Sequence, residues 1–494
     1  MDHTDIGGQN RQVANLPHGL SPLAAPNEIG DNTSAASRNS KSTSGGHLFE
    51  QTLNEASTLA DSIAPAYDLI HDAKVLSADD HRAIRQSLIL PMLENIAKYQ
   101  AGKSNWQTWH NAAMLAGGAV LGEEAWVRRA IADPKNGFAC QMDISVTADG
   151  MWYENSWGYH FYTLDAIVRI VEGARRLGID LWSHPDLKKM FFLPIRYAMP
   201  DGSLPRFGDD VHTTVSSASR MLEYAYHAYR DPSMLPNLPT RPSLESIQFG
   251  RAIGKQPPPP SQASEVFLAA GHAILRSSGE AGLTAAITFG PYGGFHGHFD
   301  KLSFVFFGYG REVGVDPGRA KSQAYRLPIH THWYKATLGH NTVLVDRKSQ
   351  QPAAGKLTVF SDGDDFAGVA ARCDDAYAGV EHRRMLYLTR RYLVVFDQLV
   401  ADKPRQFDWL YHNRGSQVQC DAATKATVPP SQPGWEYIQN ARCGPCDDPI
   451  RVRFVDEGLT THLTLAAVPG TEVLIGDSVG ESVTDRVPLG TTQE

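Results

Sequence analysis

Four consecutive prolines at residues 257–260 separate two stretches of the chain that differ in the period of their apolar residues. Before the prolines, apolar side chains recur every three to four residues, which is typical of helices; after them the period is two, which is typical of strands. Residues 251–262 are therefore predicted to form a stiff, extended linker. Because 494 residues exceed the usual size of one domain, the sequence predicts an α+β chain with two domains.

The first stretch, residues 47–250, is predicted to be helical. Its clearest helix covers residues 158–177. Asn155 or Ser156 can cap the start of this helix and Gly178 can end it. Successive antiparallel helices of this kind form a bundle, a toroid or a helical array. Similar segments lie at residues 80–99, 106–121, 122–132, 185–198 and 214–229.

The last stretch, residues 263–494, is predicted to be an antiparallel β domain, with a sandwich as the expected arrangement. Residues 1–46 are rich in Ser, Asn, Gly and Pro and have no periodicity, so we expect a disordered leader there. Strands are predicted at residues 302–307, 342–345, 385–388 and 392–396.

The composition bears on the partners of the chain. A net charge of −8 argues against nucleic acid, although a few local Arg and Lys can still line a cleft for an anionic polymer. No apolar run approaches the roughly 18 residues of a membrane span. No secretory signal opens the chain, so we expect a cytoplasmic protein as the sequence stands, or a periplasmic or secreted one if it is a trimmed piece.

Cys443 and Cys446 have the spacing of a redox motif. Such a motif needs a helix N-terminus to lower the thiol pKa, and here the neighbours are Pro, Gly and Asp. A loop pair or a local disulfide is the better interpretation.

Two patches of polar and aromatic residues precede predicted helices. Residues 153–162 place Tyr, Glu, Asn, Ser, Trp and His at one helix start, where backbone N–H groups favour anions. Residues 104–111 lead into another helix in the same way. Each patch also fits a capped helix with an aromatic core face, so neither identifies a site alone.

The densest patch contains His296 and His298 directly before a predicted strand, and Asp316 and His340 follow later in the chain. Two histidines and one carboxylate, such as His298, Asp316 and His340, suit a zinc site. The alternative is a set of unrelated loop residues at strand ends, because their spacing is not local.

A further patch comprises Tyr325, Arg326 and residues 330–335. Its alternating aromatics and cations suit sugar stacking and carboxylate pairing. An ordinary polar loop is the alternative.

In this order the patches resemble the heparinase II/III-like polysaccharide lyases, a group that includes several alginate lyases. The resemblance runs from about residue 90 to about residue 415. It implies an N-terminal (α/α) toroid or incomplete barrel followed by an antiparallel β-sandwich, in a monomer or homodimer. It further implies β-elimination in an acidic polysaccharide that contains uronic acid, such as heparan sulfate, hyaluronan, chondroitin or alginate. It depends on Asn-Trp at 105–106, Glu-x-Ser-x-x-Tyr-His at 154–160, His-x-His-x-Asp at 296–300, Asp-Pro-Gly at 316–318 and His-Asn-Thr-Val at 340–343.

The resemblance also implies roles for single residues. Tyr159 matches the catalytic acid, which in some members is also the base. Asn105 matches the residue that neutralises the substrate carboxylate, and His296 matches a histidine that assists at the reacting uronate. The remaining matches are a mainly structural zinc site at His298, Asp316 and His340, and a sugar-contacting aromatic at Tyr334.

Four more residues are candidates for binding the substrate. His160, Arg206 and Arg319 are cations or potential cations that could assist Tyr159. Trp106 stands where several alginate lyases have His, so a separate histidine base is missing there and the set is closer to heparinase III-like enzymes. His110 lies one helical turn further on and could face the same way.

Two other functions fit parts of the pattern. An (α/α)-barrel glycoside hydrolase would need two carboxylates beside its cleft, and Glu154 with Asp209 or Asp210 could supply them. A non-catalytic carbohydrate-binding protein could retain the same fold. The choice of uronate polymer cannot be read from the sequence.

Overall fold

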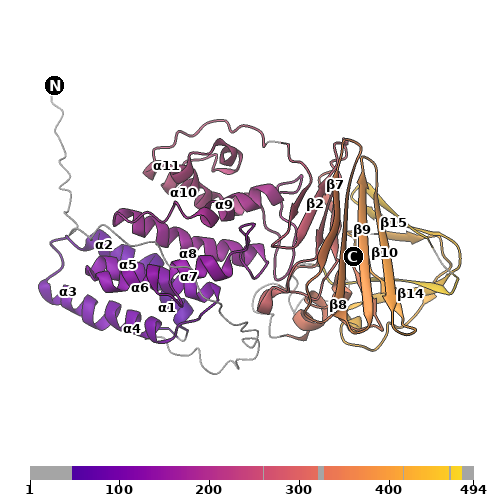
Figure 1. Cartoon of the computed structure of the whole chain (residues 1–494), viewed down its shortest axis with the longest axis horizontal. Helices are drawn as coiled ribbons and strands as arrows, with labels where there is room; N and C mark the ends of the chain where they lie inside the picture. Colours follow the sequence, from indigo (N-terminus) through magenta and orange to yellow (C-terminus); the bar gives the residue numbers. More distant parts are fainter. Residues whose placement is uncertain are drawn as a thin grey trace.

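The computed structural model describes residues 47–49, 51–259, 261–320, 327–415, 417–466 and 469–480. Helices fill the first half of this chain and strands fill the second (Figure 1). The predicted α+β architecture, helical before the prolines and antiparallel after them, is confirmed. The predicted leader and the Tyr325-Arg326 pair lie outside the described residues.

The helical half contains two helices of 17 and 20 residues among several shorter ones. None of the described helices is both long enough and apolar enough to cross a membrane. Closure of these helices into a toroid stays a prediction. The helices are α1 (Thr52–Thr58), α2 (Ala64–Ile70), α3 (Ala78–Ala83), α4 (Leu90–Lys98), α5 (Asn105–Leu121), α6 (Glu124–Ala132), α7 (Phe138–Ser145), α8 (Trp157–Arg176), α9 (Pro185–Tyr197), α10 (Ser219–Tyr229) and α11 (Leu244–Gln248).

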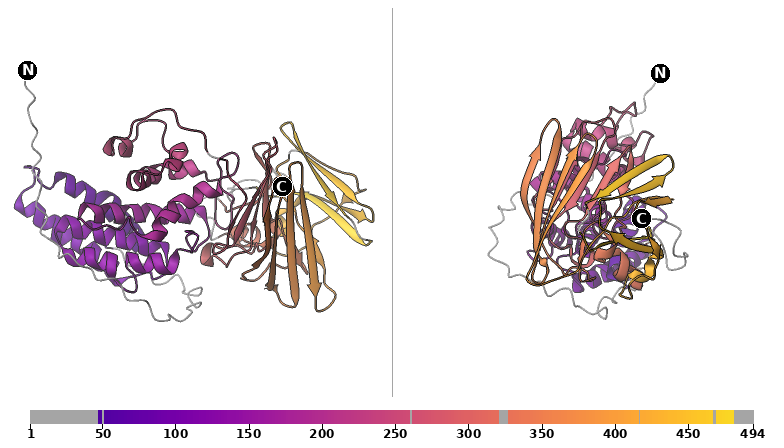
Figure 2. Two further views of the ribbon diagram at one scale, coloured as in Figure 1. Left: turned by 45° about the horizontal axis from the view of Figure 1, so that its top comes forward. Right: turned by 90° about the vertical axis from the view of Figure 1, so that its right-hand side faces the viewer.

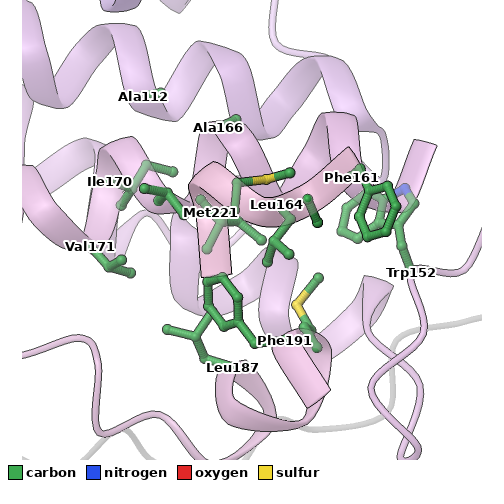
Figure 3. Close-up of a cluster of buried hydrophobic side chains, with 14 of the residues drawn as sticks. Ala112, Trp152, Phe161, Leu164, Ala166, Ile170, Val171, Leu187, Phe191 and Met221 are labelled. Atoms are coloured by element: carbon green, nitrogen blue, oxygen red, sulfur yellow. The ribbon is translucent and has the colours of Figure 1, made fainter. Parts of the chain in front are cut away.

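Helix α8 lies at the centre of the helical core. Its buried face presents Leu164 and Val171 at helical spacing, and these pack with Phe191 of α9 and Met221 of α10 (Figure 3). Against α5, a side chain at Gly173 would collide with that of Leu115, so the glycine permits close packing. This tight packing holds the body of α8 against the neighbouring helices.

The strands form antiparallel sheets. The largest has the order β1-β2-β3-β4-β5, the next β10-β9-β8-β7, and three small sheets are β11-β6, β12-β15-β16 and β13-β14-β17. Their bounds are β1 (Glu265–Phe267), β2 (His272–Arg276), β3 (Thr284–Thr288), β4 (Phe304–Gly308), β5 (Arg311–Gly314), β6 (Val343–Val345), β7 (Lys356–Asp362), β8 (Phe366–Tyr377), β9 (Val380–Thr389), β10 (Leu393–Ala401), β11 (Phe407–Trp409), β12 (Gln417–Cys420), β13 (Lys425–Ala426), β14 (Gln439–Cys446), β15 (Ile450–Asp456), β16 (Leu459–Leu465) and β17 (Thr471–Asp477).

The five-stranded sheet is covered on both faces. Ile274 and Ala286 point into the helical core, whereas Leu275 and Ile287 point into a second core shared with Leu386 of β9. All five residues of β3 are buried, as expected for a strand without a solvated face. The sheet therefore lies between the helices and the β7–β10 sheet (Figure 2), and its end loops meet the helical half.

The Cys443 and Cys446 pair lies on strand β14, and both thiols are free. Neither the expected loop pair nor the local disulfide is therefore found in this structure. Burial raises the pKa of both thiols, opposite to the change that a redox motif requires.

Candidate active site

The first turn of α8 contacts a loop of the β half. Tyr159 is the third residue of α8, and His296 ends a short 3-10 turn, Gly294–His296, before strand β4. Their rings are stacked, with centroids 3.6 Å apart and an interplanar angle of 23°. The structure therefore brings together two predicted catalytic residues from opposite halves of the chain.

Asp210 holds the start of α8 from outside the helix. Its carboxylate accepts hydrogen bonds from the backbone N–H groups of Trp157 (2.9 Å) and Gly158 (2.7 Å) and from the hydroxyl of Ser156 (2.8 Å). Ser156 occupies the N-cap position as predicted, but Asp210 supplies the acceptor. Burial raises the pKa of Asp210, and these hydrogen bonds only partly oppose it. The carboxylate satisfies N–H groups that the helix cannot.

Asp209, the preceding residue, holds the histidines. One of its oxygens lies 2.8 Å from Nδ1 of His296, and the other lies 2.9 Å from Nε2 of His298 and 3.4 Å from Nε2 of His330. Burial alone would raise the pKa of Asp209, but hydrogen bonds from His296 and His298 and the nearby histidine charges outweigh it, so the pKa is lowered. Asp209 was expected only as part of a hydrolase pair, and no local spacing connects it with the histidines.

Glu154 contacts the remaining residues of the site. The side-chain amide of Asn105 donates to both Glu154 oxygens, at 2.9 and 3.1 Å. The indole N–H of Trp152 donates to one of them at 2.6 Å, and Nε2 of His296 lies 3.6 Å from the other. Through Glu154, Asn105 joins His296 and Tyr159 in one cluster, in which Tyr159 is half-buried and the other residues are buried.

The predicted zinc ligands also converge. One ligand atom from each of His298, Asp316 and His340 lies within 4.8 Å of the others, and all three residues are buried. Nδ1 of His298 lies 3.2 Å from Nε2 of His340. Oδ2 of Asp316 lies 3.7 Å from the same Nε2 and has no hydrogen-bond partner within the described chain.

The hydrogen bonds of these ligands show that the group fits a cation. Nε2 of His298 faces a carboxylate and Nδ1 of His340 faces the carbonyl of Ala336 at 2.7 Å, so each of these nitrogens must donate. When both rings are neutral, as metal ligands must be, their other nitrogens direct lone pairs toward each other and toward Asp316. Burial raises the pKa of Asp316 to about 7. Two imidazole nitrogens and a carboxylate oxygen are the donor types that zinc takes.

Three predicted substrate-binding residues lie inside the protein, so the structure corrects these predictions. His160 has no exposed surface; its Nδ1 accepts from Trp152 N–H at 3.2 Å and its Nε2 lies 3.0 Å from the Met190 carbonyl. Burial lowers the pKa of His160 to about 4. Tyr334 is also fully buried, and its hydroxyl donates to the Gly480 carbonyl at 2.7 Å.

Arg206 is the third of these residues. It is buried and pairs with Glu312 between the helical half and strand β5. Because its guanidinium is buried in this ion pair, Arg206 has almost no exposed surface with which to bind a polymer. His110 is likewise buried within α5, so it cannot replace the missing histidine base.

The two other candidates stay predictions. Trp106 is half-buried in the first turn of α5, next to Asn105. Arg319 is half-buried, and its backbone N–H donates to the Asp210 carbonyl at 2.8 Å.

The exposed aromatic at this site is Phe295, which the sequence analysis did not single out. Its side chain is 72% exposed and lies edge-on to His296, with ring centroids 5.0 Å apart. The ammonium of Lys335 lies 5.5 Å from the centre of the Phe295 ring and donates to its carbonyl. An aromatic face and a cation thus lie beside His296.

Comparison with known families supports the resemblance in both halves. Residues 32–203 match the family model described as Alginate lyase, and residues 259–463 match the model described as Heparinase II/III-like, C-terminal.

Two similar curated proteins are alginate-degrading enzymes by name. An alginate lyase of Stenotrophomonas maltophilia is 28% identical over 423 residues, covering 76% of this chain and 56% of the relative. An exo-oligoalginate lyase of Saccharophagus degradans is 27% identical over 440 residues, covering 76% and 57%. A heparin-sulfate lyase of Pedobacter heparinus is 24% identical over 265 residues, covering 52% and 38%. The chain therefore spans little more than half the length of the first two relatives.

Solved structures show the same fold. A crystal structure of heparinase III superposes with a TM-score of 0.64 at 14% identity, covering 90% of this chain and 71% of that one. A heparan sulfate lyase of Pedobacter heparinus gives 0.60 at 15% identity, covering 86% and 67%.

Proposed function

We propose that this chain, which is alginate-lyase-like in its helical half and heparinase II/III-like in its β half, is a polysaccharide lyase. Its reaction is β-elimination in an acidic polysaccharide that contains uronic acid. The observation that carries the proposal is the ring contact of Tyr159 with His296 at 3.6 Å. Asn105 joins the same cluster through Glu154.

The first requirement of this reaction is a partner for the uronate carboxylate. The C5 proton beside an anionic carboxylate is barely acidic, so donors must stabilise the enolate-like state that forms when it leaves. Asn105 and His296 are the proposed donors, and each well-placed donor contributes about 2.7–4 kcal/mol.

The second requirement is proton transfer. Tyr159 is proposed to take the C5 proton and to return a proton to the leaving O4. Tyrosine titrates near pH 10 in water, so it needs help as a base. Positive charge on the stacked His296 ring would favour the phenolate form. With one residue for both transfers, the proton and the leaving group lie on one face of the sugar, and the elimination is syn.

His298, Asp316 and His340 are proposed to hold zinc as a structural ion. Bound zinc would supply positive charge that compensates Asp316 and would cross-link two loops of the β half. These three residues anchor the loop that carries His296, two positions before His298.

Phe295 and Lys335 are proposed to replace Tyr334 as the sugar-contacting pair. The exposed Phe295 ring can stack on a sugar, and the Lys335 ammonium can pair with a uronate carboxylate. This pair recognises a uronate without requiring sulfate. The alginate lyase relatives and the Alginate lyase family match favour alginate as the first polymer to test.

The carboxylate pair of a glycoside hydrolase has little support. Both oxygens of Asp209 contact histidines and both oxygens of Asp210 contact the start of α8. Neither carboxylate has an open side toward a substrate.

The direct test is ultraviolet detection of unsaturated products from the purified chain with alginate, hyaluronan, chondroitin and heparan sulfate. A lyase leaves a C4–C5 double bond that absorbs. Reducing ends without absorbance would identify a hydrolase, and binding without either product would identify a carbohydrate-binding protein.

A further inference from the structure

We propose that Asp209 is a positioning residue that couples the zinc-ligand set to the reacting histidine. This inference rests on the proposed function. One carboxylate lies between His296, 2.8 Å from Oδ2, and His298, 2.9 Å from Oδ1. Asp209 itself has a fully buried side chain and touches neither substrate nor metal in this scheme.

The carboxylate fixes the tautomers of both rings. Since a carboxylate only accepts, Nδ1 of His296 and Nε2 of His298 must each carry a hydrogen. The other nitrogen of His296 then faces Glu154 and the Asn105 cluster, and the other nitrogen of His298 faces His340. Carboxylate partners of this kind orient metal-binding histidines and fix their tautomer. Here the same partner also orients a histidine of the proposed reaction.

The backbone around Asp209 cannot easily move away from these rings. Its N–H donates to the His296 carbonyl at 3.0 Å. Gly208 has φ +90°, and a Cβ there would lie 2.7 Å from the same carbonyl oxygen. A side chain at Gly318 would collide with the Asp210 carbonyl, so a second β-half loop presses on the other side. Residues 208–210 are therefore clamped between two loops of the β half.

The substitution Asp209→Asn makes a specific chemical change. An amide of the same size has one acceptor and one donor, so one of the two rings must face an N–H group. If His298 reverses its tautomer, its hydrogen occupies the nitrogen that faces His340, and metal binding weakens. If His296 faces that N–H group, its Nδ1 must give up its hydrogen, so the ring can no longer carry the positive charge that the proposed reaction uses, and turnover falls.

The experiment measures zinc and turnover separately on the full chain. Zn²⁺ affinity of wild type, Asp209→Asn and Asp209→Ala is measured by competition with a chromogenic chelator, and kcat and KM are measured at saturating Zn²⁺. We expect Asp209→Ala to lose about 10- to 100-fold in Zn²⁺ affinity and, with zinc bound, about as much in kcat with little change in KM. Asp209→Asn should lose at least one of the two. Imidazole ¹⁵N shifts of the zinc-free protein should show an altered tautomer in Asp209→Asn.

The control is Glu223→Gln, which breaks a buried ion pair with Arg251 in the helical half. It should lower Tm without changing Zn²⁺ affinity, kcat or the histidine ¹⁵N shifts. Folded Asp209 variants with wild-type Zn²⁺ affinity, kcat and ¹⁵N shifts would overturn the inference. A wild-type chain that cleaves no uronate polymer would instead refute the proposed function, and the Zn²⁺ and ¹⁵N measurements would still decide the role of Asp209 as an anchor of both rings.

Discussion

Tyr159 and His296 are stacked ring on ring, with centroids 3.6 Å apart, although one lies in the first turn of the central helix and the other ends a 3-10 turn in the loop before strand β4. The contact crosses the boundary between the helical and β halves. The proposed reaction therefore depends on how firmly the two halves are held together, and the predictions below test the contact and its supports.

Replacement of Tyr159 by Phe should abolish the proton transfer and keep the ring contact with His296. We expect kcat to fall by at least about 10²–10⁴-fold with an unchanged Tm, measured by ultraviolet product formation and thermal unfolding. Tyr162→Phe is the matched control, because this phenol on the same helix packs beside Trp109. Near-normal turnover in Tyr159→Phe would refute the assignment.

Replacement of Asp210 by Asn should loosen the first turn of α8. The buried carboxylate accepts from Trp157 and Gly158 N–H groups, and loss of charged hydrogen bonds costs about 1.5–3 kcal/mol each. We expect a lower free energy of unfolding in a denaturant titration and a lower kcat, because Tyr159 lies in that turn. A stable variant with wild-type kcat would show that the turn does not need this cap.

Removal of zinc should destabilise the β half. Zn²⁺ at about 100 times its Kd would add roughly 2.7 kcal/mol to the free energy of unfolding. Chelation should therefore lower Tm in the wild type and have no effect in His340→Ala, which lacks one proposed ligand. If chelation stopped turnover without lowering Tm, the metal would have to act in the reaction itself.

The buried His110 should make the chain sensitive to mild acid. It has no exposed surface, and within the described chain neither ring nitrogen has a hydrogen-bond partner. Burial lowers its pKa from 6.5 to about 4, so the unfolded state binds a proton that the folded state rejects. Protonation of His110 therefore has no effect on the free energy of unfolding above about pH 6.5. As pH falls from there toward 4, the free energy of unfolding decreases, by on the order of 3 kcal/mol in full.

The test of this effect is His110→Leu, a similar volume without a titrating group. Its Tm should fall less steeply than that of the wild type between pH 6.5 and pH 4.5. Parallel curves for the two proteins would assign the acid sensitivity to other groups.

Replacement of Phe295 by Ala should weaken substrate binding without changing the chemical step. We expect KM to rise severalfold and kcat to stay within about twofold, which is the pattern of lost uniform binding. Phe396→Ala on strand β10 is the control, since that ring is also exposed but lies in the outer sheet. If both variants changed KM equally, Phe295 would have no specific role in binding the substrate.

The sequence predicted much of the fold because local patterns carry it. The helix expected at residues 158–177 is α8, Trp157–Arg176, because the spacing of its apolar residues and the glycine that follows it both indicate its extent. The strand expected from residue 302 begins at Phe304, because Leu302 adopts φ 63°, a left-handed conformation that ends extended pairing.

The site was predictable only in part. His160 was assigned to the site together with its sequence neighbour Tyr159, but it lies about 100° around the helix from Tyr159 and points into the core. Alternating cations and aromatics suggested Tyr334, although such a pattern does not reveal burial. The position of Asp209 between two histidines depends on docking of distant segments, which no sequence spacing records.

The double coverage of the β1–β5 sheet has a consequence for evolution and engineering. Ile274 and Ala286 complete the interior of the helices while their neighbours complete the interior of the outer sheet, so neither half is a self-sufficient module. Exchanging the helical half between two such proteins should succeed only if the residues of this sheet that face the helices are exchanged with it. Recombination between relatives should likewise keep the helices and the β1–β5 sheet together.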